Sequence, residues 1–152
     1  MLGRLARWLR ILGHDVAYFR RIEDADLVDL AARERRILLT RDTRLVQRKT
    51  ARGAVLIRSH LLEEQLRQMV LWNREALLAP RLCRRCLECN EATVLVPKAS
   101  VRDRVPAYVF KTQSRFLECP SCGRIYWRAT HVQDMLRRLR RSLQVDRKKS
   151  QD

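Results

Sequence analysis

Ile37-Leu38-Leu39-Thr40-Arg41-Asp42 contains the clearest strand signal in the chain, a continuous apolar run that is followed directly by an aspartate. Apolar runs of this kind are typical of strands that are buried on both faces, as in a parallel sheet. Reactive groups in an open parallel sheet gather beyond the carboxyl ends of its strands, and this is where Asp42 is placed. The stretch predicts an α/β fold with a candidate functional carboxylate at a strand end.

The sequence around this run alternates between helical and strand-like patterns. These patterns predict helices over residues 2–12, 24–31 and 62–70 and strands over residues 16–19 and 55–57. Gly13 stands where a helix commonly ends, and Asp24 is a candidate N-cap of the second helix. The alternation of helices with unbroken apolar strands predicts a parallel sheet flanked by helices.

The part of the chain after residue 80 differs in composition, because it holds all five cysteines: Cys83, Cys86, Cys89, Cys119 and Cys122. We place a boundary at Ala79-Pro80-Arg81 and predict two domains, over residues 1–80 and 81–152. The apolar patterns of the second domain predict short strands over 94–96, 108–110 and 125–127, a basic C-terminal helix over 130–143 and a frayed tail over 146–152. The spacing of Thr130 and Gln133 fits a capping box at the start of that helix.

Two Cys-x-x-Cys pairs, Cys86/Cys89 and Cys119/Cys122, indicate a metal site. Two residues between thiolates allow both sulfurs to reach one tetrahedral Zn²⁺ from a tight turn. Four thiolates close the coordination shell, so the predicted zinc is structural. Disulfides are the alternative, but the odd number of cysteines and the lack of a secretion signal argue against them.

Cys83 complicates this assignment, because Cys83 and Cys86 also form a Cys-x-x-Cys pair. The turn around a metal usually needs a left-handed residue directly after its second cysteine, where Gly or Asn is favoured. Asn90 and Gly123 occupy those positions in the chosen pairs, whereas Leu87 follows Cys86. We therefore predict that Cys83 is free.

Acidic residues gather in one short stretch of the first domain: Glu23, Asp24, Asp26 and Asp29. The position of Asp42 at a strand end allows it to meet Asp24 or Asp26. Clustered carboxylates repel one another unless a cation joins them, and Mg²⁺ or Mn²⁺ supplies such a cation in phosphodiester hydrolysis. In the alternative interpretation, Asp24 and Asp42 cap helices and the other acids are solvated. Spacing alone favours the alternative.

The charge balance indicates a polyanionic partner. The 152 residues carry 33 Lys and Arg against 17 Asp and Glu, a formal net charge of +16, and only five of the 33 are Lys. Guanidinium groups pair with phosphate in a fork, so we expect a nucleic acid as the partner, with a merely solvated basic surface as the alternative. The composition excludes a disordered or collagen-like chain. No apolar run predicts a membrane span or a signal peptide, so we expect a cytoplasmic protein.

Several basic and aromatic residues are candidates for RNA contacts. Arg4, Arg7 and Arg10 recur on one helical face, and aromatic residues among arginines near the second cysteine pair are able to stack on bases. The candidate RNA-binding residues are Arg4, Arg7, Arg10, Arg41, Arg124, Trp127 and Arg128.

Several unrelated motifs, in one order over roughly residues 1–135, resemble the Mut-seven C-terminal RNase domain family. The opening Met1-Leu2-Gly3-Arg4-Leu5-Ala6-Arg7-Trp8-Leu9-Arg10-Ile11-Leu12-Gly13 is similar to that family's start, and Ile37–Asp42 is similar to its strand-plus-aspartate motif. Arg85–Asn90, Val105–Tyr108 and Cys119–Trp127, followed by His131, resemble its zinc ribbon. This conjunction is far more specific than any single motif.

The resemblance implies a PIN-like nuclease domain followed by a zinc ribbon, and a metal-dependent ribonuclease that uses Mg²⁺ or Mn²⁺. It implies that Asp24, Asp26 and Asp42 hold the catalytic ion and that Cys86, Cys89, Cys119 and Cys122 hold zinc. The family begins with a strand that ends in an aspartate just before the position of Met1. Either the start of this sequence is misassigned or truncated, or this version of the domain is a reduced one. If the chain is complete, we expect a sheet without that strand and weak or absent hydrolysis. The alternative functions are an RNA- or ribosome-binding module of the same fold with impaired catalysis, and a protein-interaction adaptor.

Overall fold

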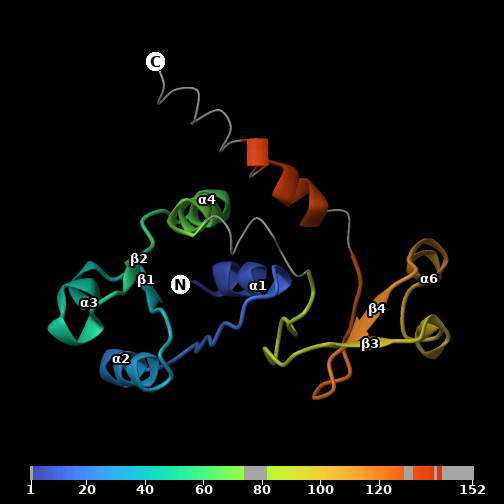
Figure 1. The fold of residues 1–152 in the computed structure, drawn as a ribbon, viewed down its shortest axis with the longest axis horizontal. Helices are drawn as coiled ribbons and strands as arrows, with labels where there is room; N and C mark the ends of the chain where they lie inside the picture. Colours follow the sequence, from blue (N-terminus) through green and yellow to red (C-terminus); the bar gives the residue numbers. More distant parts are fainter. Residues whose placement is uncertain (1, 74–81, 129–131, 139, 142–152) are drawn as a thin grey trace.

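The computed structural model describes residues 2–73, 82–128, 132–138 and 140–141 (Figure 1). The predicted boundary at 79–81, the capping residue Thr130 and the tail over 146–152 lie outside the described residues. Within the described part of the chain, no helix is long and apolar enough to cross a membrane.

The first part of the chain alternates helices with short strands, as the sequence predicts. It contains α1 (Gly3–Ile11), α2 (Asp24–Arg33), β1 (Leu39–Thr40), α3 (Thr43–Gln47), a 3-10 turn (Lys49–Ala51), β2 (Val55–Leu56) and α4 (Leu62–Trp72). The two strands pair in parallel, with Leu39 opposite Val55 and Thr40 opposite Leu56. The α/β class and the small parallel sheet are therefore confirmed, whereas the PIN-like detail stays a prediction.

Gly13 lies just past the end of α1, as predicted. The Gly13 N–H donates to the Arg10 carbonyl at 2.9 Å, and the His14 N–H donates to the Leu9 carbonyl at 3.0 Å. This pair of hydrogen bonds needs a left-handed residue, and Gly13 supplies it with a φ of 93°. The chain therefore turns sharply out of α1 into the segment 14–19.

The prediction of a strand over Val16–Phe19 is wrong. The segment is extended but pairs with no strand, and Tyr18 and Phe19 are exposed. Side chains take the place of a neighbouring strand, because the Val16 N–H donates to Asn90 Oδ1 at 2.9 Å and the Val16 carbonyl accepts from the Arg10 guanidinium. An apolar run in the sequence does not indicate whether a neighbouring strand is present to pair with it.

The predicted start of the second helix is shifted by one residue. Glu23, not Asp24, is the N-cap of α2, and its side chain makes no capping hydrogen bond. Asp24 and Asp26 lie in the first turn, where a carboxylate is stabilised by the helix dipole. The acidic cluster therefore has a local structural role.

The second part of the chain contains an antiparallel sheet in the order β3-β4-β5, formed by Val94–Val96, Phe116–Glu118 and Ile125–Tyr126. Between β3 and β4 lie a 3-10 turn (Lys98–Val101) and α6 (Ala107–Thr112). The predicted strand over 108–110 is therefore wrong, because Val109 and Phe110 pack against the ribbon core from a helix that follows Pro106. Strand β4 is not among the strands predicted from the sequence.

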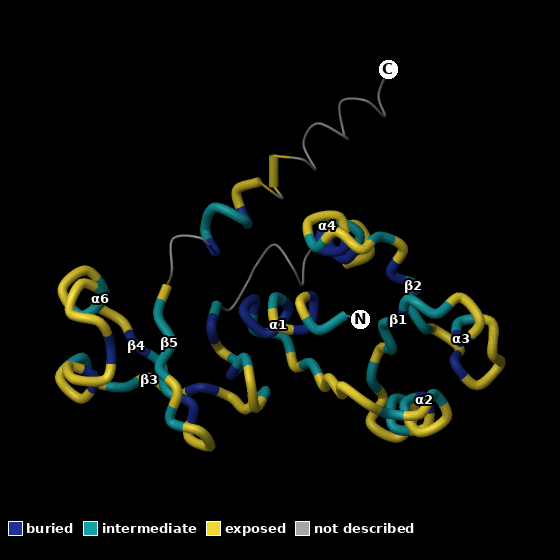
Figure 2. The backbone as a smooth tube through the Cα atoms, turned by 180° about the vertical axis from the view of Figure 1, so that it is seen from behind, coloured by how far each residue is buried: buried dark blue, intermediate teal, exposed yellow. Residues whose placement is uncertain are grey.

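The main core joins residues from both ends of the chain (Figure 2). Leu5 and Leu9 of α1 and Leu66 of α4 pack with Val132 and Leu136, which lie on the helical residues 132–138. Within the described residues of the predicted C-terminal helix, the apolar side chains are thus packed against the first part of the chain. The ribbon keeps a small core of its own around Val101, Val105 and Phe116.

Candidate functional site

The two Cys-x-x-Cys pairs come together. The sulfur atoms of Cys86, Cys89, Cys119 and Cys122 all lie within 4.8 Å of one another. Ligands about 2.3 Å from one ion lie at most about 4.6 Å apart, so small shifts place all four sulfurs around one zinc ion. The four-cysteine cluster is consistent with a structural zinc site in a ribbon.

Both pairs lie on loops with the same backbone pattern. Cys86 N–H donates to the Glu91 carbonyl and Cys119 N–H donates to the Arg124 carbonyl, at 2.8 and 2.9 Å. The residue after each second cysteine is left-handed, with φ of 64° at Asn90 and 70° at Gly123. This agrees with the turn argument that selected these two pairs. We call the loop over residues 86–90 the first knuckle.

Cys83 lies outside the cluster, as predicted. Its side chain is buried, and its Sγ lies 3.6 Å from the Trp127 carbonyl. Burial raises the pKa of the Cys83 thiol above its usual value. A neutral buried thiol of this kind behaves as a small apolar side chain.

Without a cation, the cluster cannot carry four negative charges. Burial opposes ionisation of Cys86, but hydrogen bonds from the Tyr126 hydroxyl and from the Cys89 backbone lower its thiol pKa to about 6. The hydrogen bond to Cys122, together with burial and the nearby charge of Cys86, raises the thiol pKa of Cys89 to about 12. A divalent cation removes this conflict by stabilising all four thiolates.

The first knuckle is fastened to α1 through a buried arginine. The Arg10 side chain is only 7% exposed. Its guanidinium donates to the carbonyls of Leu87 at 2.7 Å and Glu88 at 3.1 Å, and to the Val16 carbonyl at 2.7 Å. The predicted RNA-binding role does not fit Arg10, because its donors already bind backbone carbonyls inside the protein.

Asn90 extends this connection to the segment 14–19. Besides accepting from Val16 N–H, its side-chain amide donates to the Asp15 carboxylate at 2.6 Å. Asp15 also accepts from Arg36 at 3.0 Å, and this hydrogen bond is the largest factor that lowers the Asp15 pKa below its usual value. The first knuckle thus holds one wall of the neighbouring pocket.

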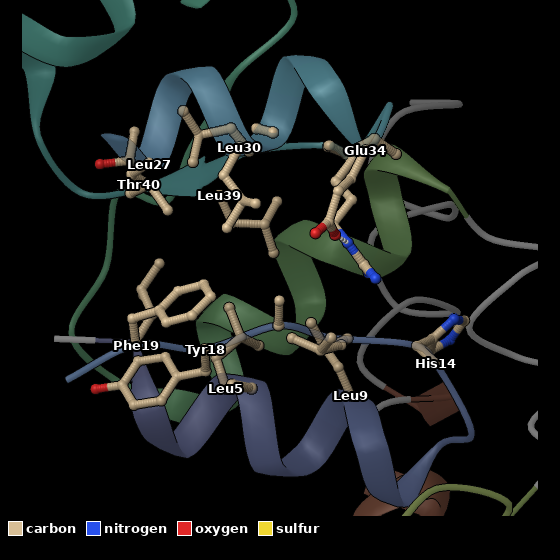
Figure 3. Close-up of a pocket in the computed structure, with 18 of the residues that line it drawn as sticks. Leu5, Leu9, His14, Tyr18, Phe19, Leu27, Leu30, Glu34, Leu39 and Thr40 are labelled. Atoms are coloured by element: carbon tan, nitrogen blue, oxygen red, sulfur yellow. Dashed lines mark hydrogen bonds and ion pairs between the residues drawn. The ribbon is translucent and has the colours of Figure 1, made fainter. Parts of the chain in front are cut away.

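That pocket has a volume of about 680 Å³ and lies between α1, α2, β1 and α4 (Figure 3). Its lining is largely apolar, and the leucines labelled in Figure 3 are Leu5, Leu9, Leu27, Leu30 and Leu39. Figure 3 shows His14 and Glu34 at one end and Phe19 and Thr40 at the other. The pocket therefore reaches the carboxyl end of β1.

Asp24 and Asp42 both line this pocket, and Asp26 does not. The Asp42 carboxylate caps α3, because its Oδ1 accepts from the N–H groups of Arg44 at 2.7 Å and Leu45 at 3.2 Å. Asp24 pairs with Arg48 at 3.4 Å. The cysteine cluster is the metal-binding group that the described residues provide, so Asp24, Asp26 and Asp42 do not converge as metal ligands in this structure.

The remaining candidate RNA contacts have different surroundings. Arg4 and Arg128 are exposed, and Arg7 and Arg124 both pair with Glu88, at 3.3 and 3.4 Å. Arg41 lines the pocket and contacts His60 Nδ1 at 2.9 Å. Trp127 packs against the ribbon core. Arg4, Arg41 and Arg128 are thus the candidates that pair with no acid among the described residues.

The family comparison covers the pocket and the cysteine cluster together. A family model described as the Mut7-C RNAse domain matches residues 1–139. The chain belongs to this family. No curated protein and no solved structure gives a significant match. The Mut7-C match spans both predicted domains, in agreement with the resemblance seen in the sequence motifs.

Sequence reasoning missed the residues that connect the two parts of this Mut7-C chain. Arg10 was assigned to the surface because its spacing matches Arg4 and Arg7. Asn90 was recognised only for its backbone, and Tyr126, whose hydroxyl lies 3.1 Å from Cys86 Sγ, was assigned no role at the metal. These contacts join residues about 40 to 80 positions apart, so no local pattern predicts them.

Proposed function

We propose that this Mut7-C chain is a divalent-metal-dependent ribonuclease that acts at the pocket beside β1 and carries a structural zinc ribbon. The observation that carries the proposal is that Asp24 and Asp42 both line one pocket. They begin α2 and follow β1, and they match the acidic residues that the family resemblance implies for catalysis. RNA is the substrate class that the family description and the charge of +16 favour.

Zinc fits the cysteine cluster. Cys86, Cys89, Cys119 and Cys122 would hold it, and four thiolates leave no open position for a substrate or a catalytic water. Its contribution is therefore to folding. Because Arg10 and Asn90 join the first knuckle to residues 14–19, an ion held there would also support this wall of the pocket.

The carboxylates of Asp24 and Asp42 do not form a ready-made site for a second metal ion. Asp42 caps α3, and Asp24 is paired with Arg48. No catalytic step through Mg²⁺ or Mn²⁺ follows from this arrangement. The residues of the chain itself supply binding: Arg41 borders the pocket next to Asp42, and a guanidinium there is suited to an RNA phosphate.

Exchange of Asp24 for asparagine is expected to lower RNA cleavage by about 10-fold or more, since it removes a carboxylate from the pocket. The measurement is cleavage of labelled RNA with added Mn²⁺ or Mg²⁺ and without added divalent ion. Asp29→Asn is the matched control, because Asp29 lies on the same helix, pairs with Arg33 and does not line the pocket. Equal cleavage by the Asp24 and Asp29 variants, or cleavage that needs no added ion, contradicts the proposal.

A second candidate function is RNA binding without hydrolysis. The cap formed by Asp42 and the ion pair of Asp24 favour it, because both carboxylates already have structural partners. The two functions differ in one result. A binding module holds RNA with an affinity that falls steeply as salt rises and leaves labelled RNA intact at every divalent-ion concentration.

A further inference from the structure

We propose that the end of the ribbon remote from the zinc cluster binds single-stranded RNA through a surface made of Lys98, Arg102, Tyr108 and Lys111, here called the ribbon tip. The proposal rests on the proposed function for its substrate class and adds a second contact region for the same RNA. Figure 1 shows α6, which carries Tyr108 and Lys111, at the end of the ribbon away from α1 and α2.

The first observation is how the positive charges of the chain are compensated. Several arginines of the described residues pair with an acidic side chain, as Arg33 does with Asp29 and Arg104 does with Glu118. The three cations of the ribbon tip form no ion pair with any described residue. Their charge is therefore available to an external anion.

The second observation is that two of these cations share one aromatic ring. Lys98 Nζ lies 4.9 Å and Arg102 Cζ lies 5.4 Å from the centre of the Phe110 ring. Both charges are thus within about 10 Å of each other, which is about one Debye length at 0.1 M salt. The Phe110 ring attracts both cations and holds them near each other. Adjacent phosphates of one RNA strand are able to pair with both charges.

The third observation is an aromatic side chain that has no packing role. Tyr108 is 74% exposed, more than any other large hydrophobic residue in the described part of the chain. Lys111 follows it by three residues on α6, so the two side chains are neighbours on the helix surface. Lys98 and Arg102 contact Phe110, two residues further along α6 and on another side of the helix, so Lys111 is the cation beside the Tyr108 ring. Single-stranded nucleic acids stack their bases on exposed rings that have a cation beside them.

An acidic protein surface would also neutralise the cations, but it would make no use of the Tyr108 ring. RNA uses both, because its phosphates meet the cations and its bases present flat faces to the ring. The ribbon tip therefore favours an unpaired RNA strand that extends from the pocket region along the ribbon.

The test measures binding of a fluorescent single-stranded oligouridine by anisotropy over a range of salt concentrations. All proteins carry Asp42→Asn, so that binding is separated from cleavage. The double variant Lys98→Gln/Arg102→Gln is expected to reduce the slope of log affinity against log salt by about 1.4. Tyr108→Leu is expected to weaken binding by about five-fold or more, whereas Tyr108→Phe keeps the ring and binds like the parent within about two-fold.

Arg33→Gln is the matched control, because it removes an exposed arginine that already pairs with Asp29. An unchanged salt slope in the double variant, or equal binding by the Tyr108→Leu and Tyr108→Phe variants, overturns the proposal. Competition by polyglutamate as effective as that by unlabelled RNA overturns it as well, in favour of an acidic protein partner. The proposed ribonuclease function fails separately, when the wild-type protein leaves RNA intact.

Discussion

Replacement of Cys119 by serine is expected to abolish tight zinc binding and to unfold the ribbon. Cys119 is buried within the four-sulfur cluster, and the hydrophobic core of the ribbon is confined to a few residues around Val101, Val105 and Phe116. Structural zinc contributes about 10–16 kcal/mol to folding in zinc-finger peptides, far more than such a core provides. Elemental analysis should change from about one zinc per chain to almost none after exposure to a chelator.

Cys83→Ala is the matched control for this prediction. Cys83 is also a buried cysteine of the same part of the chain, but its sulfur lies outside the cluster. Its variant should keep the zinc content of the wild type and lose only the packing of a small side chain. Zinc content that is unchanged in Cys119→Ser, or that is lost in Cys83→Ala, shows that the ligand set is wrong.

Replacement of Arg10 by alanine is expected to destabilise the protein by about 3 kcal/mol or more. The variant loses charged hydrogen bonds to Val16, Leu87 and Glu88 and leaves partly buried carbonyls without a donor, at about 1–3 kcal/mol each. For a protein of this size the midpoint of thermal unfolding should fall by roughly 6–12 °C. Calorimetry of the zinc-loaded protein measures this change.

Arg4→Ala is the control on the same helix. Arg4 is exposed and precedes Arg10 by six residues, so its loss should change the free energy of unfolding by less than about 0.5 kcal/mol. A similar, small effect of both variants would mean that the first knuckle is not fastened to α1 through Arg10. Amide exchange that rises in residues 14–19 of the Arg10 variant alone would agree with the role assigned to it.

The amino-acid sequence predicts those features that depend on local chemistry. Three such features follow from residues close in sequence and are confirmed by the structure: the parallel pairing beside Leu39, the turn at Gly13 just past α1, and the choice of Cys89 over Cys83 as the partner of Cys86. Asn90 and Gly123 were chosen because they tolerate left-handed backbone, and both adopt it.

Features that depend on distant partners were not predictable in this way. Val16–Phe19 reads as a strand, but its partners are side chains from α1 and the first knuckle. Residues 108–110 read as a strand as well, yet they form a helix whose inner face covers the ribbon core. Periodicity over three or four residues does not separate a short strand from one turn of helix.

For the candidate catalytic residues too, the local features are predictable from the sequence and the contacts with distant residues are not. The position of Asp42 after β1 was predictable from the apolar run before it, and so was its alternative role as a helix cap. Whether Asp24 and Asp26 lie near it depends on how α2 packs against β1, which the sequence does not state. Asp24 reaches the pocket, and Asp26, two residues further along the helix, does not.

The most direct measurement for the central claim compares wild type with Asp42→Asn in cleavage of labelled RNA, with both proteins loaded with zinc. Asparagine caps a helix about as well as aspartate, so this variant keeps α3 and removes only the charge. We predict that cleavage falls by about 100-fold or more while RNA affinity stays within about two-fold. Equal cleavage by the two proteins would contradict the claim that this pocket hydrolyses RNA.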